Sequence, residues 1–408
     1  MKWQYKPRWL ADNLRQAVEF SPVVVLSGAR QSGKSTLLRY EAPFREWRYV
    51  TLDDFDTYDL AKNNPLELVS LHEKLIIDEV QKCPELLPAI KMAVDRDRRL
   101  RLILSGSANL LLMKQVTESL AGRCLYFDLL PFALGEESSQ PVPEWLKTGA
   151  VEPAMSMSES SPMGNEQLFR GALPPVTFLE KEAHVSAWWT AYTKTYLERD
   201  LRDFSRISDI PDFRRVMVLL ASRSAQILNQ ATIARETRVS QPTVNRYINL
   251  LEMSGLYFKL QPYSRNVKKR VVKSPKGYFL DTGLMCSLTG LKRSAQIEPD
   301  FRGQLFETRV FHNLLAVADT LGGHVYYLRK QGGLEREIDF ILELEDKILA
   351  IEVKASSQVS FKDAENIEKL QTMLSERPMG FVIYNGDKIK KLRQNILAVP
   401  DRLLSTGG

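Results

Sequence analysis

Short runs of consecutive apolar residues alternate with helical segments in the first third of the chain. Continuous apolar runs of this length are typical of strands that are buried on both faces of a parallel sheet. With helices between them, they predict an α/β layered domain over residues 1–135. The runs are PVVVLSG (22–28), RYVTLD (48–53), KLIIDE (74–79), LRLILSG (100–106) and CLYFDLL (124–130).

The pattern changes after residue 135. Residues 136–165 are rich in Ser, Pro and Glu, which predicts a linker or exposed loop. A mainly helical stretch follows, interpreted as a helical lid over 166–215 and a winged helix over 216–292. Residues 293–408 are predicted to form a second α/β domain. Its strands are HVYYLRK, EIDFILELE, KILAIEVKA and GFVIYNG, and its flanking helices lie around 303–320 and 361–376.

Composition narrows the class of protein. The 408 residues are 44% apolar and 26% charged, which argues against a fibrous or wholly disordered chain. No apolar run is long enough to span a membrane, and the first residues lack the apolar core of a signal peptide. The three scattered cysteines fit a reducing, cytoplasmic location. The net charge of +6 favours a polyanionic partner.

The first apolar run leads into the sequence GARQSGKST, which is followed by helical LLRY. This is the G-x-x-x-x-G-K-[ST] pattern in a strand–loop–helix context, and it predicts a P-loop that binds ATP. Backbone N–H groups of such a loop surround the phosphates, a lysine reaches the β- and γ-phosphates, and a hydroxyl ligates Mg²⁺. The predicted nucleotide-binding residues are Gly28, Ala29, Arg30, Gln31, Ser32, Gly33, Lys34, Ser35 and Thr36.

A second acidic motif is expected to complete this site. The apolar strand LIIDE ends in Asp78, predicted to hold Mg²⁺ together with Ser35, and in Glu79, predicted to polarise the attacking water. The next strand ends in SGSAN, where Ser105 or Ser107 could sense the γ-phosphate.

Arg123 follows in the sequence SLAGRC, immediately before the last strand of this domain. An arginine at this place could reach the γ-phosphate of a neighbouring subunit as a finger in trans. The alternative is a surface ion pair.

Several stretches together resemble prokaryotic AAA-type ATPases that carry a second domain of long-unassigned function. They are GARQSGKSTLL, LIIDEVQ, LSGSANLL and SLAGR, then TYLERDL (195–201) and GYFLDTGL (277–284). The resemblance covers nearly the whole chain. It implies a Mg²⁺-dependent ATP hydrolase that assembles as a homo-oligomer, in general a ring. It also implies a lid arginine that contacts ATP, either Arg170 or Arg199.

Residues 229–251 predict two helices joined by a short turn, and the basic hairpin-like sequence that follows completes a winged helix. Val244, Tyr247, Ile248 and Leu251 have the spacing of a buried helix face. The opposite face presents side chains able to contact DNA, and so does the hairpin; the alternative is a lid or a protein contact. The predicted DNA-binding residues are Gln241, Thr243, Asn245 and Arg246 on the helix and Arg265, Lys268, Lys269 and Arg270 in the hairpin, where Lys273 and Lys276 add further charge.

A group of polar residues interrupts the strands of the C-terminal region. Asp339 lies within an apolar strand, and Glu352 and Lys354 project from one face of the next. Two carboxylates can hold Mg²⁺ or Mn²⁺, and a neighbouring lysine can orient the attacking water. With Glu307 on the preceding helix, the pattern resembles the PD-(D/E)xK nucleases of the Holliday-junction-resolvase type, although Ile338 replaces the proline. The resemblance implies a catalytic set of Glu307, Asp339, Glu352 and Lys354.

These motifs together predict an ATP-hydrolysing, metal-dependent enzyme that processes DNA, with cleavage at junctions, forks or ends. One alternative is an ATPase that remodels or translocates DNA and carries a catalytically silent nuclease-like domain. The other is a nucleotide-switched regulator that binds DNA.

Overall fold

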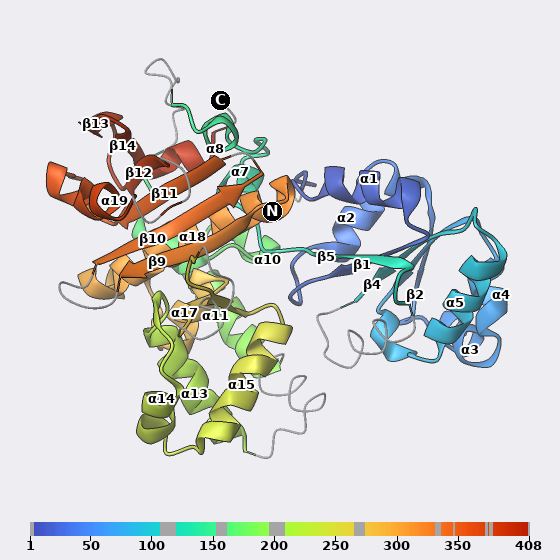
Figure 1. The fold of residues 1–408 in the computed structure, drawn as a ribbon. Helices are drawn as coiled ribbons and strands as arrows, with labels where there is room; N and C mark the ends of the chain where they lie inside the picture. Colours follow the sequence, from blue (N-terminus) through green and yellow to red (C-terminus); the bar gives the residue numbers. More distant parts are fainter. Residues whose placement is uncertain are drawn as a thin grey trace. The chain divides into compact units, whose positions relative to one another are not determined.

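A computed structural model of the chain describes residues 4–106, 120–151, 161–195, 209–264, 274–330, 336–345, 347–371, 374 and 378–406. The chain divides into two compact units (Figure 1). The P-loop unit comprises Lys2–Pro131 with Leu250–Leu256. The C-terminal unit comprises Phe132–Asn249 and Tyr257–Gly408.

The P-loop unit is built on a five-stranded sheet in the order β2-β3-β4-β1-β5. All the neighbouring strands run parallel, and β4 lies between β1 and β3. Each predicted apolar run of this region forms one strand, so this part of the fold prediction is confirmed. The strands are β1 (Val23–Ser27), β2 (Arg48–Thr51), β3 (Lys74–Asp78), β4 (Arg101–Ser105) and β5 (Cys124–Asp128).

Helices cover both faces of this sheet. Val24 and Leu26 point to one face, where α1 (Ala11–Phe20) and α2 (Lys34–Tyr40) complete a core. Val23 and Val25 point to the other face. That face is covered by α3 (Phe55–Asn63), α4 (Pro65–Ser70) and α5 (Leu86–Arg96), with a short 3₁₀ turn at η2 (Val80–Lys82). The 3₁₀ turn η1 (Phe44–Glu46) packs on the first face, with α1 and α2. Because both faces of the sheet are covered, successive residues of a strand are all buried, and this explains the continuous apolar runs in the sequence.

The first half of the C-terminal unit is mainly helical and includes a small antiparallel sheet in the order β6-β8-β7. The predicted core face of α15 is confirmed, because Val244, Tyr247 and Ile248 are buried. The elements are α9 (Asn165–Arg170), α10 (Pro174–Thr177), α11 (Glu182–Tyr192), α13 (Ile210–Ser222), β6 (Gln226–Ile227), α14 (Gln230–Thr237), α15 (Gln241–Met253, in this unit to Asn249), β7 (Tyr257–Leu260), β8 (Lys276–Phe279) and α17 (Thr282–Leu288).

The second half contains a six-stranded mixed sheet in the order β13-β14-β12-β11-β10-β9. The first three strands along the chain are antiparallel, whereas β12 and β14 run parallel to β11. The four predicted strands are present; β13 and β14 were not predicted. The strands are β9 (His324–Lys330), β10 (Arg336–Leu344), β11 (Lys347–Lys354), β12 (Met379–Tyr384), β13 (Lys390–Arg393) and β14 (Ile396–Pro400).

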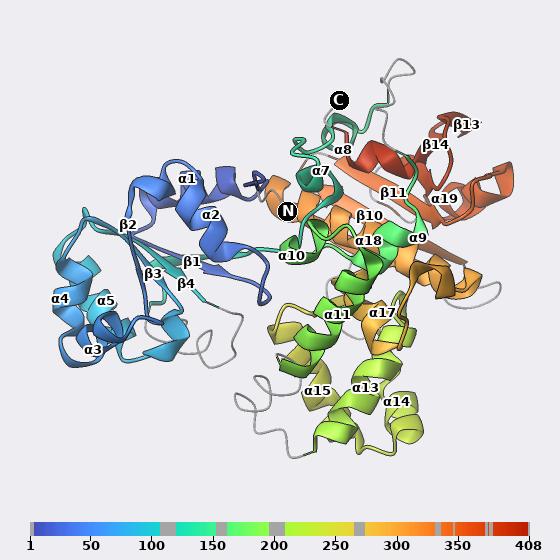
Figure 2. The same cartoon turned by 180° about the vertical axis from the view of Figure 1, so that it is seen from behind.

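Two helices pack on this sheet, as Figure 2 shows from the reverse side. α18 (Pro299–Leu321) packs on β9, β10 and β11, and its Phe311 stacks on Phe340. α19 (Glu365–Leu370) packs with the next strand residue, Ile341, and so covers the other face. Short 3₁₀ turns lie at η4 (Ser294–Gln296), η5 (Phe361–Ala364) and η7 (Asp401–Leu404).

The prediction of a linker over residues 136–165 is wrong for its first part. This segment forms α8 (Glu144–Thr148), and α7 (Leu134–Glu137) overlaps its start. Trp145 is only 1% exposed, its ring packs edge-on against Phe381, and its Nε1 donates a hydrogen bond to the backbone oxygen of Leu403. One large apolar side chain therefore anchors a polar sequence. Residues 152–160 lie outside the described residues.

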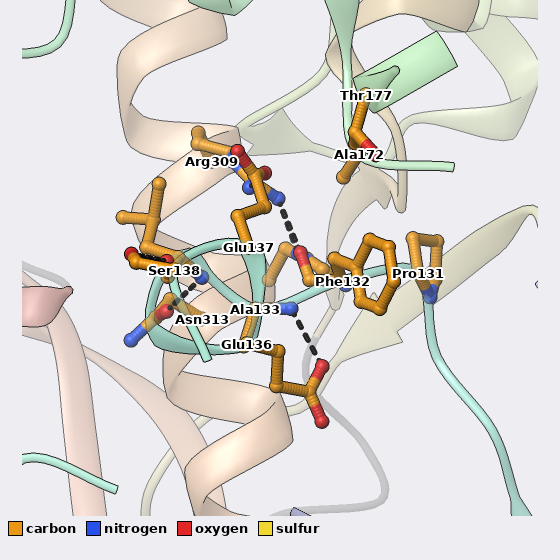
Figure 3. Close-up of polar contacts among 12 residues, drawn as sticks. Pro131, Phe132, Ala133, Glu136, Glu137, Ser138, Ala172, Thr177, Arg309 and Asn313 are labelled. Atoms are coloured by element: carbon orange, nitrogen blue, oxygen red, sulfur yellow. Dashed lines mark hydrogen bonds and ion pairs between the residues drawn. The ribbon is translucent and has the colours of Figure 1, made fainter. Parts of the chain in front are cut away.

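The start of the C-terminal unit is anchored on α18, as Figure 3 shows. The backbone oxygen of Phe132 accepts a hydrogen bond of 2.9 Å from the guanidinium of Arg309, and Leu134 N donates one of 2.9 Å to Asn313. Arg309 is 2% exposed and forms an ion pair with Glu137. A polar stripe on one buried helix thus holds the incoming chain.

Among the described helices, none combines the length with the hydropathy that crossing a membrane would require.

Candidate functional sites

The turn from β1 to α2 has the geometry of a phosphate-binding loop. Gly28 has a φ of +142°, and a Cβ there would lie 2.4 Å from the backbone oxygen of Leu129. Gly33 has a φ of +98° directly before α2. Side chains other than hydrogen would be strained or would clash at these positions. The glycines of the motif are therefore required by the backbone path, which leaves the N-terminal end of α2 facing the loop.

Lys34 is buried against the loop. Its Nζ donates hydrogen bonds of 2.9 Å to the backbone oxygens of Gly28 and Ala29. Burial lowers the pKa of Lys34 to about 8, against the opposing effect of the nearby carboxylates of Glu79 and Asp78. The ammonium is thus held by neutral carbonyl groups that a phosphate can replace.

Ser35 and Asp78 meet at the carboxyl edge of the sheet. The hydroxyl of Ser35 donates a hydrogen bond of 2.6 Å to Oδ2 of Asp78. The hydroxyl of Tyr49, on β2, donates to the same oxygen. A hydroxyl and a carboxylate are oxygen ligands of the kind Mg²⁺ prefers, so these residues fit the predicted ion. Tyr49 was missed from the sequence, because an aromatic residue in a strand carries no distinctive signal.

Glu79 follows Asp78 in an unusual backbone conformation. Its φ of +57° lies in the left-handed region, which costs about 1–2 kcal/mol for a residue other than glycine. Its carboxylate accepts a hydrogen bond from Gln81, and burial raises its pKa. Backbone strain of this kind often marks a functional position. A carboxylate with a raised pKa is suited to accept a proton from water.

Ser105 ends β4, the strand next to the one that leads into the P-loop. Its side chain is buried, and its hydroxyl has no hydrogen-bond partner among the described residues. A buried hydroxyl without a partner is unfavourable unless a ligand or water satisfies it. This observation fits the predicted γ-phosphate sensor. The alternative candidate, Ser107, lies outside the described residues.

The loop has a further anchor that the sequence did not reveal. Arg8 is buried, and its guanidinium donates hydrogen bonds of 2.9 Å to the backbone oxygen of Ser32 and of 2.6 Å to that of Leu130. It thereby joins the P-loop to the segment after β5. The other predicted loop residues, Arg30, Gln31 and Thr36, lie in the loop or in the first turn of α2.

Arg123 lies at the amino ends of the strands, whereas the P-loop lies at their carboxyl ends. It precedes β5, whose five residues span about 16 Å, so its side chain cannot reach the P-loop of its own subunit. Its guanidinium forms a two-point ion pair with Asp95 of α5, with N–O distances of 2.7 and 2.9 Å. Of the two lid arginines, Arg170 is the last residue of α9 in the C-terminal unit. Arg199 lies outside the described residues.

The C-terminal unit brings Asp339, Glu352 and Lys354 together. Phe340 pairs with Ile351, which places Asp339 opposite Glu352. A register shift between Ile338 and Ile341 marks a bulge on the side of β9, and such bulges re-aim side chains. Oδ2 of Asp339 accepts a 2.8 Å hydrogen bond from the backbone N–H of Val353, and Nζ of Lys354 lies 3.3 Å from Glu352.

Glu352 is buried beside Asp339. Burial and this neighbouring carboxylate raise the pKa of Glu352 well above its ordinary value, against the opposing effect of Lys354. Asn366 of α19 donates a hydrogen bond of 3.3 Å to its other oxygen. Within the described part of the chain, no three or more His, Cys, Asp or Glu side chains gather as a metal site. A divalent ion here would thus have two protein carboxylates, which fits the water-rich shell of Mg²⁺.

Glu307, the predicted acid of the helix, contacts Lys276 and Tyr278. Its Oε1 lies 3.3 Å from Nζ of Lys276 and accepts a 2.8 Å hydrogen bond from Tyr278. Burial alone would lower the pKa of Lys276, but the carboxylates of Glu307, Asp339 and Glu337 outweigh it and raise that pKa. The prediction that Lys276 adds charge to an exposed hairpin is therefore wrong, because acidic neighbours hold it in the interior.

The predicted DNA-facing residues of α15 lie away from its core face. Gln241, Asn245 and Arg246 are exposed, and Thr243 is half-buried. Asn245 accepts a hydrogen bond of 3.2 Å from Gln230. The hairpin residues Arg265, Lys268, Lys269 and Arg270 lie outside the described residues.

Comparison with protein families separates the chain into three segments. A model described as an AAA domain matches residues 20–137. Two models of domains of unknown function, DUF8612 and DUF4143, match residues 164–295 and 302–404. The N-terminal region is therefore a P-loop ATPase domain with a parallel sheet, as predicted. None of these matches supports the nuclease-like interpretation of the C-terminal domain.

Similar proteins match over most of the chain. Uncharacterized proteins of Mycobacterium bovis and Mycobacterium tuberculosis are each 30% identical over 404 residues, which cover 97% of this chain and 84% of theirs. An uncharacterized protein of Haemophilus influenzae is 23% identical and covers 88% of each chain. Among solved structures, the Walker-type ATPase PABY2304 of Pyrococcus abyssi matches 70% of this chain and 99% of its own, with a TM-score of 0.45 at 16% identity. The chain belongs to the same family as the uncharacterized mycobacterial protein Rv2008c.

Proposed function

We propose that the protein is an ATP-hydrolysing, metal-dependent enzyme that processes DNA. In this proposal, the P-loop unit hydrolyses Mg²⁺-ATP and the C-terminal domain cleaves phosphodiester bonds at junctions, forks or ends. The observation that carries the second activity is the strand pairing that places Asp339 opposite Glu352, with Lys354 beside them.

The residues of the P-loop unit support ATP hydrolysis. Lys34 would exchange its carbonyl partners for the β- and γ-phosphates, and Ser35 with Asp78 would hold Mg²⁺. Glu79 would orient and deprotonate the attacking water, and Ser105 would hydrogen-bond the γ-phosphate. The bound ion would neutralise the charge that develops on the phosphate oxygens.

Arg123 supports a proposal of assembly. Since it lies at the edge of the sheet opposite the P-loop, it could act only on the nucleotide of a neighbouring copy. Such an arrangement needs a homo-oligomer, such as a ring, in which the amino ends of the strands of one subunit face the P-loop of the next. Arg123 would then exchange Asp95 for the γ-phosphate of the neighbour.

The C-terminal domain would cleave by metal-assisted hydrolysis. Asp339 and Glu352 would hold Mg²⁺ or Mn²⁺, which would activate a water and stabilise the charge on the phosphate. Lys354, which is 37% exposed, would orient that water or contact the phosphate. Glu352 is buried and Asp339 beside it is partly buried, and two such carboxylates side by side are costly without a cation, which favours a site that binds one.

DNA contact is proposed for the middle of the chain. The order α13-β6-α14-α15-β7-β8 is that of a winged helix, in which α15 would enter the major groove. Gln241, Asn245 and Arg246 on its exposed face can contact bases and phosphates. The basic hairpin residues between β7 and β8 would add phosphate contacts.

One observation favours the rival function, an ATPase with a catalytically silent domain. Lys276 already pairs with Glu307 and Asp339, two of the carboxylates that a nuclease would use. In this rival, the domain would bind DNA or support assembly without cutting.

A direct assay distinguishes the two. The full chain is incubated with Mg²⁺ or Mn²⁺, with and without ATP, on labelled linear, forked, four-way and single-stranded DNA and on RNA. The proposal predicts metal-dependent products from at least one DNA. Absence of cleavage with both metals, in a preparation that hydrolyses ATP, would favour the silent domain.

A further inference from the structure

Lys276 is a buried lysine surrounded by carboxylates. Its side chain is 4% exposed, and Nζ lies 3.3 Å from Oε1 of Glu307 and 3.8 Å from Oδ1 of Asp339. It also forms an ion pair with Glu337. A buried ammonium is unfavourable unless opposite charges offset its lost hydration. The ammonium of Lys276 is thus a built-in cation among the carboxylates of Glu307, Glu337 and Asp339.

The fold fixes the position of this ammonium. Lys276 begins β8, where it pairs with Leu260 of β7 and with Ile227 of β6. Two residues further along, Tyr278 donates a hydrogen bond to Glu307 and stacks on Phe311 of α18. Strand pairing therefore fixes the backbone at Lys276, and the ion pairs hold its ammonium in the interior.

The other lysine of the cluster is held more loosely. Nζ of Lys354 lies 3.3 Å from Glu352, but its side chain is 37% exposed and lies at the end of β11. It can swing into solvent and leave Glu352 beside Asp339. The cluster therefore has one permanent cation, near Glu307, and one position that a divalent ion can take.

We infer that Lys276 takes the place of a second metal ion, so that the C-terminal site holds a single divalent ion between Asp339 and Glu352. Nucleases with two metal ions place them about 3.5–4 Å apart on either side of the reacting phosphate. Here Asp339 contacts Lys276 through Oδ1, while its Oδ2 is bonded to Val353 N, next to Glu352. This inference rests on the proposed nuclease function.

The roles of the residues then change. Glu307 and Glu337 are positioning residues that anchor Lys276, and neither is a metal ligand. The buried ammonium can offset the charge of the carboxylates around it, but it cannot lower the pKa of a bound water as a metal ion does. Water activation would therefore fall to the single ion and Lys354.

Calorimetric titration of the nucleotide-free full chain with MnCl₂ tests the inference. Wild type is expected to bind one more Mn²⁺ per chain than Glu352→Gln. An ion bound by Ser35 and Asp78 would be present in both proteins and would not affect this difference. Glu307→Gln, which keeps an acceptor for Lys276 and Tyr278, should bind this ion within about twofold of wild type because it removes no metal ligand. Lys276→Met should bind a second Mn²⁺.

The outcomes separate this inference from the function on which it rests. Three results would overturn the assignment of Lys276 and leave the nuclease site standing. They are two ions that depend on Glu352 in wild type, a loss of Mn²⁺ affinity of tenfold or more in Glu307→Gln, and a single such ion in folded Lys276→Met. No ion that depends on Glu352 would overturn the nuclease function itself. If Lys276→Met does not fold, the wild-type and Glu307→Gln titrations decide alone.

Discussion

The P-loop and the C-terminal cluster each combine lysine with carboxylates, but they distribute the charges differently. Lys34 donates to backbone oxygens and leaves Asp78 to the hydroxyls of Ser35 and Tyr49. In the C-terminal cluster, Lys276 and Lys354 both pair with carboxylates. The first arrangement keeps a cation ready for phosphate and an acid ready for metal. In the second, the carboxylates are partly neutralised by the lysines of the protein itself.

The two sites also differ in how the chain assembles them. The P-loop comes from one continuous segment, completed by the ends of β3 and β4. The C-terminal cluster needs β8, α18, β10 and β11, which lie far apart in the sequence. A local motif can therefore specify the first site, whereas only the folded structure shows what surrounds the second.

The largest effect is expected at the P-loop. Lys34→Ala should abolish ATP turnover, because it removes the ammonium that is held over Gly28 and Ala29. Lys82→Ala, which removes only a surface ion pair with Asp53, is the matched control and should hydrolyse ATP like wild type. Phosphate release measures ATP hydrolysis, and equilibrium titration measures ATP binding. Turnover by Lys34→Ala at the wild-type rate would disprove the site.

The finger proposal predicts the next largest effect. Arg123→Ala should bind ATP normally but hydrolyse it more slowly, on the order of 1000-fold for an arginine finger. Mixing it with Glu79→Gln subunits should restore some hydrolysis, because mixed interfaces combine an intact arginine with an intact glutamate. Asp95→Asn, which removes only the partner seen here, should retain activity. If Arg123→Ala hydrolyses ATP at the wild-type rate, Arg123 is not a finger and forms only a surface ion pair.

Arg309 offers a contrast in stability rather than in chemistry. Arg309→Met should destabilise the chain by about 3–5 kcal/mol, because the partly buried carboxylate of Glu137 and the backbone oxygen of Phe132 would both lose this partner. Arg223→Met breaks the exposed pair with Glu236 and should cost at most about 1 kcal/mol. Urea unfolding followed by tryptophan fluorescence measures both. Equal losses in the two variants would contradict the role assigned to α18.

The smallest effect concerns the hairpin between β7 and β8. Removing the charges of Lys268, Lys269 and Arg270 should weaken duplex binding evenly across sequences. Each lost phosphate contact should reduce the slope of log K against log salt by about 0.9. Binding measured at several salt concentrations gives that slope. An unchanged slope would assign the hairpin to protein contact.

Sequence patterns predicted the parts of the fold in which local chemistry decides the outcome. The parallel strands of the P-loop unit are buried on both faces, so their apolar runs were visible, and the glycines of the loop mark backbone positions that other residues cannot occupy. Strand alternation also placed Glu352 and Lys354 on one face of a strand, but the register that sets Asp339 opposite Glu352 is visible only in the structure. Trp145 could not be placed, because its partners come from the last strands and turns of the chain.

Lys276 shows the limit most clearly. Its neighbours in the sequence are basic, and such a run usually indicates an exposed surface. Burial is decided instead by Glu307, Glu337 and Asp339, which reach it only after the sheets have formed. Arg8 and Tyr49 were missed for the same reason, since their partners are distant in the sequence.

We propose that the chain carries two separate metal-dependent active sites, and one reciprocal experiment tests this proposal most directly. Glu352→Gln and Lys34→Ala are assayed side by side for DNA cleavage and for ATP hydrolysis. Glu352→Gln should hydrolyse ATP like wild type and cut DNA about 100-fold more slowly or not at all, because its neutral amide is a poor ligand for Mg²⁺. Lys34→Ala should lose ATP hydrolysis. Cleavage that persists in Glu352→Gln, or loss of both activities in it, would contradict the claim.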